Sequence, residues 1–558
     1  MPSIRALWVL AALLTAIWFV NLDTRRLIHP DEGRYAEIAR EMAATGDWVT
    51  PRLNDLKYFE KPPLQYWITA SAYRAFGVHE WTARLWPAFA GFLGILSIGY
   101  AGFALGGAML GTLASFVLAG MLWHAAMAQI LTLDSGLSFF LALGFAGFVI
   151  AQRAEATANE RRVWMWVVWA AMSGATLSKG LIGIALPGGA LFTYSVVTRD
   201  FALWRRLHVA SGLVLYLILT VPWFVAVSRA NPEFFHFFFI HEHFERFLTT
   251  EHHRPGAWYY FVPLLLAGLL PWLTVILYGM RSAWRDGVRN PLGFSWQRFA
   301  LVFAAFVFVF FSASESKLPS YILPMFPPLA LVIAWLVMRL PPLTLYRLLL
   351  PLVVIAAAVA AVAFVAYEYC APRIAGSAAS ADKLLAFGPY LKASALVEAL
   401  VGIGALAALR LVARPDAARL WGIALLSLAS LAGFQIANAG YNVFSTTRSA
   451  SAILARAQEA APIAPETPFY QVEMYDQTVP YYLGRPTRLV HFRDELALGI
   501  DAEPSKAIPT IAAWITEWAG LPQGYALMPP ELQQKLAAQG VPMRVLASDL
   551  RRVVVSRR

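Results

Sequence analysis

Residues 31–63 read DEGRYAEIAREMAATGDWVTPRLNDLKYFEKPP and lie between the first two hydrophobic segments of the chain. Twelve charged residues fall in this stretch, although only 14% of all 558 residues are charged. A solvated loop between two membrane spans is the simplest interpretation of such a composition. The spacing of the residues predicts instead an ordered loop, and the rest of the chain is organised around it.

Two helices are predicted within this loop. Asp31 is placed to cap a helix from about residue 32 to 44. Pro62 stands at the start of a second helix that reaches Phe76. Each helix has an apolar face, so we expect two amphipathic helices at the membrane surface. Lys61 precedes the second helix, where free backbone N–H groups favour an anion, and a phosphate is the expected ligand.

The composition is that of an integral membrane protein, with 59% hydrophobic residues and 20 tryptophans. The net charge of +11 does not indicate a nucleic acid partner, because a chain buried mostly in a bilayer offers no basic groove. We expect this charge to orient the chain and to contact anionic lipids. Cys370 is the only cysteine, which excludes an intramolecular disulfide and a cysteine-based structural metal site.

About 13 segments are long and apolar enough to span a bilayer. They cover approximately residues 6–22, 82–104, 106–123, 134–151, 163–178, 180–197, 208–228, 258–280, 297–312, 319–338, 346–368, 390–411 and 418–437. The first segment lacks a small-residue cleavage site, so we interpret it as an uncleaved span. With the N-terminus in the cytoplasm, the inner connections that carry charge are basic, as the positive-inside rule expects. The odd number of spans then places the C-terminus outside.

Two of the predicted outer connections are also basic, against that rule. They are the first loop, residues 23–81, and the stretch 229–257. Basic residues retained on the outer side indicate an anionic ligand there.

The composition becomes that of a soluble domain after about residue 447. Strands are predicted at 468–475, 487–492, 541–546 and 552–555, and a helix at 530–539. The sequence thus predicts a polytopic α-helical membrane domain, 1–446, that includes the first loop, followed by a small α/β domain, 447–558, on the outer side.

The acidic pair Asp31 and Glu32 directly follows the first span, at the outer surface. A helix cap is the commoner role for such an aspartate, worth about 1 kcal/mol. A carboxylate beside a phosphate-binding lysine also suits transfer from a phosphorylated donor. Lys61 could instead be a surface lysine that snorkels.

Further candidates lie at the ends of later spans. Asp134 opens an apolar run, and a carboxylate that faces a membrane cavity indicates function more often than not. Lys317 and Tyr321 belong to a short outer turn and can donate to phosphate or sugar oxygens, although such a turn would exist in any case. Lys179 is a weaker candidate of the same kind.

The outer stretch HEHFER begins at His241 and ends at Arg246. The planar guanidinium of Arg246 suits phosphate oxygens. A divalent metal such as zinc, held by His241 and Glu60, is the sharper alternative, but no HExxH-like spacing supports it. An aromatic, charged helix on the membrane surface is the third interpretation.

The string DEGRYAEIAREM…GDWVTPRLNDLKYFEKPPLQYW, together with the SKLPSY turn, resembles the bacterial 4-amino-4-deoxy-L-arabinose transferases of lipid A. These enzymes belong with the protein O-mannosyltransferases to the GT-C superfamily of polytopic glycosyltransferases. The resemblance implies a donor of undecaprenyl phosphate carrying aminoarabinose, and as acceptor a lipid A phosphate at the periplasmic face of the inner membrane. It also implies resistance to cationic peptides such as polymyxin, with no required cofactor.

The resemblance also implies roles for individual residues. Asp31 matches the essential first-loop acid and Asp134 a second acid near the site. Lys61 and Arg246 match positions that hold the carrier phosphate, with Tyr58 and Tyr321 lining it. A lipid A phosphate is already ionised near neutral pH, so Asp31 or Asp134 is expected to orient the acceptor or pair with the aminosugar ammonium.

Two other functions are consistent with the residues. One is a polyprenyl-phosphate-sugar-dependent transferase that acts on a protein or another lipid. The other is a lipid-sugar transporter. Transporters tend to be built from two repeated halves, and no such repeat is evident in the sequence.

Overall fold

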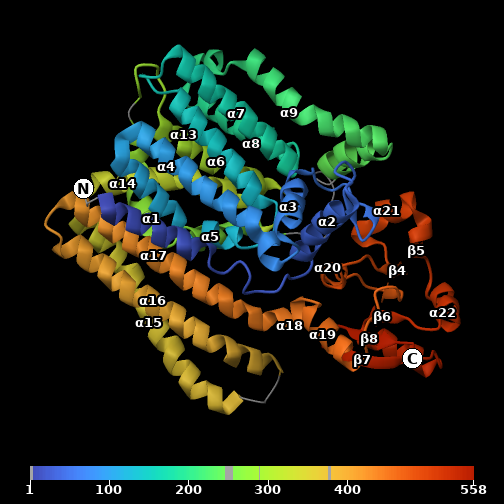
Figure 1. Cartoon of the computed structure of the whole chain (residues 1–558). Coiled ribbons are helices and arrows are strands. Elements are labelled where there is room, and N and C mark those ends of the chain that lie inside the picture. Colours follow the sequence, from blue (N-terminus) through green and yellow to red (C-terminus); the bar gives the residue numbers. More distant parts are fainter. Residues whose placement is uncertain (1–3, 246–255, 288, 375–378, 558) are drawn as a thin grey trace. The chain divides into compact units, whose positions relative to one another are not determined.

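The computed structural model describes residues 4–245, 256–287, 289–374 and 379–557 (Figure 1). The chain divides into two compact units. The first, here called the membrane unit, contains Met1–Asn21 and Trp86–Gly440. The second, the mixed unit, joins the first loop to the C-terminal segment, Leu22–Leu85 with Tyr441–Arg558. This division differs from the predicted one, which assigned the first loop to the membrane domain.

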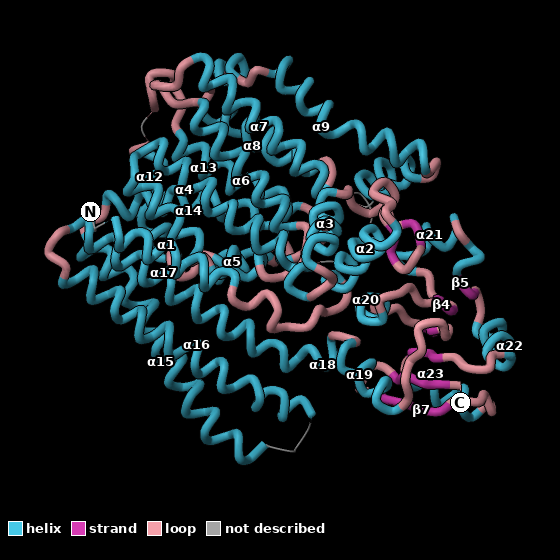
Figure 2. The backbone as a smooth tube through the Cα atoms, in the orientation of Figure 1, coloured by secondary structure: helices cyan, strands magenta, loops and turns pink. Residues whose placement is uncertain are grey.

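The described residues of the membrane unit form helices joined by loops and turns (Figure 2). Its longer elements are α1 (Ile4–Phe19), α4 (Glu80–Ala119), α6 (Asp134–Ala151), α7 (Ala158–Lys179), α8 (Ile182–Thr198), α9 (Val209–Ala230), α12 (Leu273–Arg285), α13 (Trp296–Ala313), α14 (Phe326–Arg339), α15 (Pro342–Ile374), α16 (Ala379–Leu411) and α17 (Pro415–Gly440). Shorter ones are α5 (Leu122–Ala128), η1 (Ala202–Arg206), η2 (His236–Glu245), α11 (Phe261–Gly268) and η3 (Pro319–Met325). A helix therefore lies in every range that was predicted to span the membrane.

The number of spans differs between sequence and structure. Within the described residues, eight helices are long and apolar enough to cross a membrane, or nine if α11 and α12, bent by 100°, form one span. α4 covers the two spans predicted over 82–104 and 106–123. Its helix is broken close to the boundary between them, at Gly106 and Gly107, where Gly107 has a φ of 78° that favours glycine. A multi-pass helical protein is thus confirmed, while the count of thirteen stays a prediction.

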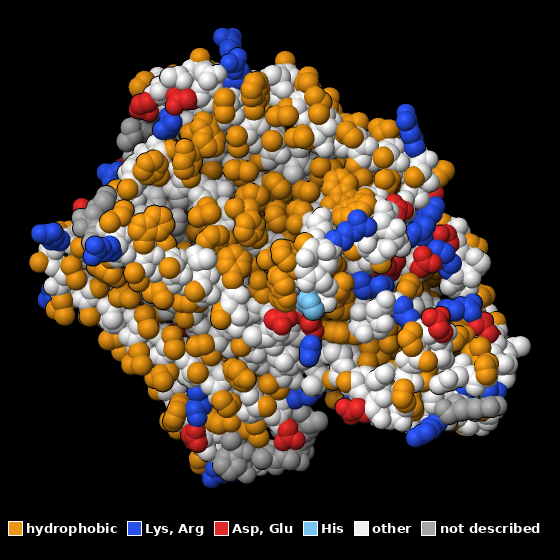
Figure 3. Space-filling model, in the orientation of Figure 1, with side chains coloured by type: hydrophobic (Ala, Val, Ile, Leu, Met, Phe, Trp, Pro, Cys, Tyr) orange, Lys and Arg blue, Asp and Glu red, His pale blue; other side chains and the backbone are white. Residues whose placement is uncertain are grey.

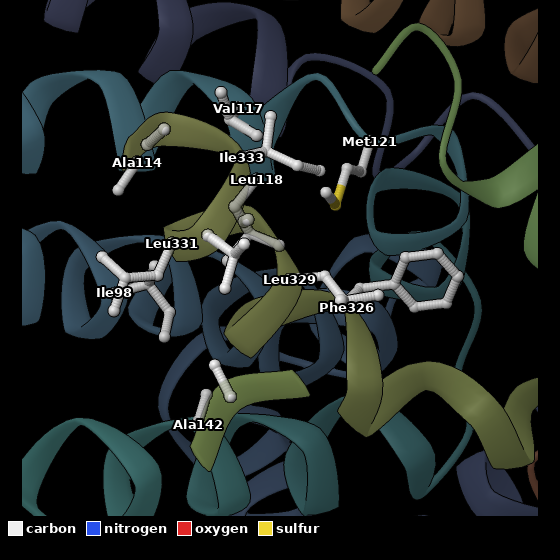
Figure 4. Close-up of a cluster of buried hydrophobic side chains, with 14 of the residues drawn as sticks. Ile98, Ala114, Val117, Leu118, Met121, Ala142, Phe326, Leu329, Leu331 and Ile333 are labelled. Atoms are coloured by element: carbon white, nitrogen blue, oxygen red, sulfur yellow. The ribbon is translucent and has the colours of Figure 1, made fainter. Parts of the chain in front are cut away.

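A continuous apolar core holds the membrane unit together. Side chains from α4, α6 and α14 meet in it, among them Val117, Ala142 and Ile333 (Figure 4). α14 is central, since 83% of the apolar span that contains it is buried, whereas only 12% of the α15 span is buried. α15 and α16 pack together as a hairpin (Figure 1). Hydrophobic side chains remain exposed over much of the face in Figure 3, as expected of a surface in contact with lipid tails.

The mixed unit is built from two distant parts of the chain. The first loop supplies α2 (Asp31–Thr45), β1 (Arg52–Leu53), β2 (Leu56–Lys57) and α3 (Leu64–Phe76). The C-terminal segment supplies η4 (Tyr441–Phe444), α18 (Ser445–Arg448), α19 (Ser451–Ala460), β3 (Phe469–Val472), α20 (Thr478–Leu483), β4 (Arg488–Val490), η5 (Asp494–Leu496), α21 (Ala497–Ala502), η6 (Pro504–Lys506), β5 (Ala507–Ile508), α22 (Ile511–Gly520), β6 (Tyr525–Met528), α23 (Pro530–Ala538), β7 (Arg544–Ser548) and β8 (Val553–Ser556).

The C-terminal strands form one six-stranded sheet in the order β5-β4-β3-β6-β8-β7. β3 pairs in parallel with β4 and β6, with Gln471 opposite Leu489 and Leu527, and β8 is antiparallel to both of its neighbours. The four predicted strands and the helix at 530–539 are confirmed. β6 escaped prediction because all four of its residues are buried, so its sequence YALM does not alternate between polar and apolar.

Two expectations about the first loop are wrong. Asp31 does not cap α2: Pro30 is the N-cap residue, and Asp31 lies in the first helical turn. α2 is also not a helix lying on a membrane surface, because Glu32 to Met42 are all buried. The reason is packing against α20, where a Cβ on Gly33 would lie 2.8 Å from the backbone nitrogen of Thr478. A glycine is needed for so close an approach.

Candidate functional site

The predicted acid Asp31 lies at the start of α2, in the mixed unit. Its side chain is 43% exposed, and Oδ1 accepts a hydrogen bond of 3.1 Å from Nη1 of Arg34. The other terminal nitrogen of Arg34 pairs with the carboxylate of Glu495. Gln477 in turn donates to that carboxylate. A half-exposed carboxylate at the first loop is therefore held by a nearly buried arginine.

Glu32, the second predicted acid, has different surroundings. Its carboxylate accepts two hydrogen bonds from Arg25, at 2.7 and 3.0 Å, and two from Arg84, at 2.8 and 3.0 Å. All three side chains are at most 3% exposed. Burial alone would raise the pKa of Glu32, but the two guanidinium groups outweigh it and hold the pKa well below its usual range. Such a buried, fully paired carboxylate suits structural support, and its catalytic role stays a prediction.

The predicted phosphate ligands of the first loop lie between β2 and α3. Nζ of Lys61 donates to the backbone oxygen of Glu60 at 2.7 Å, and α3 begins three residues later. Tyr58 is buried, and within the described residues its hydroxyl has no hydrogen-bond partner. Burial raises the pKa of Tyr58 well above its usual value, so the hydroxyl keeps its proton and can donate.

In the membrane unit, three helices bring an acid, a lysine and a tyrosine together. Asp134 is the first residue of α6 and forms an ion pair with Lys179, the last residue of α7. Nζ of Lys179 lies 4.7 Å from the ring centroid of Tyr321 in η3, a cation–π contact. The Tyr321 ring packs on Phe311, with 4.9 Å between centroids. Lys317 is buried and donates to the backbone oxygen of Ser314 at 2.5 Å.

The remaining predictions concern the outer stretch near η2. Arg246 lies outside the described residues, and of His241 only the backbone, within η2, is described. In the part of the chain that the structure describes, no three His, Cys, Asp or Glu side chains are grouped to hold a metal ion. Metal binding by Glu60 and His241 stays a prediction.

Sequence reasoning missed Arg34 and Glu495 as partners of the first-loop acid, and it named Lys179 only as a weaker candidate. Arg34 stands three positions after Asp31, which is the spacing of neighbours on a helix, so the contact could have been predicted. The contribution of Glu495 carries no comparable signal, because more than 400 residues separate it from the first loop. Lys179 was ranked below the other lysines because nothing in the sequence shows that it meets Asp134.

Two family models match the chain. One is described as the aminoarabinose transferase C-terminal domain and covers residues 455–557. The other is described as dolichyl-phosphate-mannose-protein mannosyltransferase and covers residues 3–238.

Curated relatives from several bacteria match the chain as well. The undecaprenyl phosphate-alpha-4-amino-4-deoxy-L-arabinose arabinosyl transferase of Erwinia tasmaniensis is 32% identical over 329 residues, which is 58% of this chain and 58% of the relative. That of Edwardsiella ictaluri is 32% identical over 349 residues, 61% of each chain. The chain thus spans about three fifths of the length of these two relatives.

Solved structures match over the whole length. The crystal structure of ArnT from Cupriavidus metallidurans in the apo state is 38% identical, with a TM-score of 0.89, and the match covers 100% of this chain and 99% of that one. The structure of the same protein bound to undecaprenyl phosphate gives a TM-score of 0.90, with 38% identity and coverage of 99% and 98%.

Proposed function

This chain belongs to the ArnT family of aminoarabinose transferases, and on that premise we propose that it moves 4-amino-4-deoxy-L-arabinose from undecaprenyl phosphate to a phosphate group of lipid A. The observation that carries this proposal is the full-length similarity to an ArnT whose crystal structure contains undecaprenyl phosphate. The names of the curated relatives support the same donor and the same sugar. Lipid A as acceptor rests on the family resemblance of the first-loop string.

The reaction exchanges one phosphate for another at the anomeric carbon of the sugar. The bond from this carbon to the carrier phosphate oxygen breaks, and its electron pair leaves with undecaprenyl phosphate. A bond to a lipid A phosphate oxygen forms. Because this acceptor is already ionised, no proton has to be removed, and Asp31 or Asp134 orients the acceptor or pairs with the sugar ammonium. Lys61 and Arg246 stabilise the departing phosphate by their charge, the kind of electrostatic help that such sites exploit.

The location and the lack of a cofactor belong to the same proposal. The chain lies in the bacterial inner membrane, with its N-terminus in the cytoplasm and the active site and C-terminal domain in the periplasm. No cofactor is required, since the lysine and arginine supply the positive charge. Zinc at Glu60 and His241 is the alternative, and loss of activity with a chelator, reversed by Zn²⁺, would favour it.

Purified protein in detergent tests the proposal against its rivals. It is incubated with undecaprenyl phosphate-aminoarabinose and either lipid A or a hydroxyl-bearing peptide, and mass spectrometry follows the aminosugar adduct. An adduct on lipid A alone supports the proposal. An adduct on the peptide would favour a protein transferase. Detergent micelles have no two compartments between which a lipid could be moved, so the absence of any transfer product would favour a transporter. Asp31→Asn at equal concentration is the matched negative control.

A further inference from the structure

The pair of Asp31 and Arg34 is unlike an ordinary ion pair on a helix surface. Such pairs are exposed on both sides and contribute little. Here the side chain of Arg34 is only 11% exposed, whereas that of Asp31 is 43% exposed. The arginine is therefore fixed by its surroundings while it presents one nitrogen to an accessible carboxylate.

The surroundings of Arg34 come from the C-terminal segment. Glu495, whose side chain is 10% exposed, pairs with one terminal nitrogen of the guanidinium. Gln477 donates to Glu495 and so holds that carboxylate in place. The planar guanidinium can bind two carboxylates in fixed directions, which a lysine cannot do.

The backbone of α2 is fixed at the same point. A Cβ on Gly33 would lie 2.8 Å from the carbonyl carbon of Gln477 and 2.7 Å from Cγ2 of Thr478. The first turn of α2 thus rests on the start of α20 with no space between them. Gln477 therefore lies beside the backbone of this turn and also binds the carboxylate that holds Arg34.

We propose that Arg34 is a positioning residue that orients the carboxylate of Asp31 for sugar transfer, and that the C-terminal segment sets its position through Glu495. This inference rests on the proposed function for the role of Asp31, although the contact itself does not. The C-terminal segment thereby takes part in catalysis without touching the substrate. Its side chains hold the guanidinium of Arg34, and Arg34 in turn orients the carboxylate of Asp31.

The first test measures the contact without measuring activity. Full-length protein in detergent is treated with a water-soluble carbodiimide and glycinamide, and peptide mass spectrometry gives the rate of modification at Asp31. Arg34 occupies one oxygen of this carboxylate, so Arg34→Gln is expected to raise the rate several-fold and Glu495→Gln to raise it less. Arg493→Gln is the control, since it breaks an exposed ion pair with Asp501 in the same segment and is expected to leave Asp31 unchanged.

The second test asks whether Arg34 acts through Asp31. We expect Arg34→Gln to lower kcat on the order of 100-fold with little change in KM, the size of effect that a misplaced group produces. Arg34→Lys keeps the positive charge but cannot bind two carboxylates in fixed directions, so its kcat is expected to lie between those of wild type and Arg34→Gln. In an Asp31→Asn background, adding Arg34→Gln is expected to change the residual rate by less than about twofold, because residues that act as a unit are not additive.

The two tests fail in different ways. Equal modification of Asp31 in wild type and Arg34→Gln would overturn the inference whatever the enzyme does. A kcat loss of the same size with and without the Asp31 carboxylate would also overturn it, and would leave Arg34 a structural residue. If wild type transferred no aminoarabinose at all, the proposed function would fail, and the modification rates would still decide whether Arg34 controls Asp31.

Discussion

Glu32 and Asp31 are neighbours in the sequence, but the structure predicts opposite consequences when each is changed to its amide. Glu32→Gln removes the negative charge that lies between Arg25 and Arg84 and leaves two buried guanidinium groups without it. Breaking a buried ion pair by removing one partner costs about 3–5 kcal/mol. For a unit of this size, with a shift of about 2–4 °C per kcal/mol, the expected fall in Tm is about 6–20 °C.

Asp31→Asn changes a half-exposed pair, so its cost in stability is expected to stay below about 1 kcal/mol. It is the matched control, because the proposal predicts that it loses transfer while it keeps its Tm. Thermal unfolding of both variants in the same detergent at pH 7, followed by near-ultraviolet circular dichroism, separates the two effects.

The pH dependence gives a second view of the same group. The pKa of Glu32 in the folded state lies below its ordinary value of 4.5, so the unfolded chain binds more protons in acid. The stabilisation is complete above about pH 5 and is lost as the pH falls below the ordinary pKa. The difference in Tm between wild type and Glu32→Gln should therefore narrow in acid. A variant that melts within about 2 °C of wild type at pH 7 would refute this reasoning, since it would mean a cost below about 1 kcal/mol.

Three further predictions concern other parts of the chain. Lys179→Met should lower transfer at least about tenfold and destabilise the membrane unit. Adding Asp134→Asn should recover part of the lost stability, because removing both partners of a buried pair costs less than removing one. A double variant that is less stable than Lys179→Met would contradict this. Burial, with Glu37 beside it, raises the pKa of Glu41, so the folded state loses stability as the pH rises above the ordinary pKa of 4.5. Glu41→Gln should therefore raise Tm more at pH 8 than at pH 5. An equal rise in Tm at both pH values would contradict a raised pKa of Glu41. Gly33→Ala should cost about 1–3 kcal/mol in chemical unfolding, whereas Gly520→Ala, which adds a methyl group in open space, should cost far less.

The helices of the membrane unit could be predicted because their signal is local. Each depends on an apolar run in one stretch of sequence, and a helix was found in each predicted range. Their number as spans was harder to predict. A boundary between residues 104 and 106 was predicted, and the helix breaks next to it at Gly106 and Gly107. The 100° bend between α11 and α12, in contrast, falls inside the single span that was predicted over 258–280.

The first loop shows where local reasoning stops. Its two helices were predicted nearly to the residue, but their surroundings were not, because α2 is covered by a segment that follows it by more than 400 positions. A buried face and a membrane-facing face have the same apolar pattern, so periodicity could not separate them. Gly33 was the one residue that could have indicated a close contact, as a glycine within a helix is costly unless something needs the space.

The candidate acids were predicted as types but not in their pairings. Nothing in the local sequence distinguishes the half-exposed Asp31 from the buried Glu32, because the difference comes from Arg25, near the start of the first loop, and from Arg84, which follows its end. Asp134 was chosen because acids in apolar segments are costly, and the structure adds Lys179 as its partner.

The most direct test of the proposed function is the modification of lipid A in cells that lack their own aminoarabinose transferase. Wild type, Asp31→Ala and Lys61→Ala are compared at matched expression, and mass spectrometry of extracted lipid A gives the amount of aminosugar adduct. We predict an adduct with wild type and its loss in both variants. Well-expressed wild type that leaves lipid A unmodified would contradict the proposed sugar or acceptor, and full modification by Asp31→Ala would contradict the proposed site.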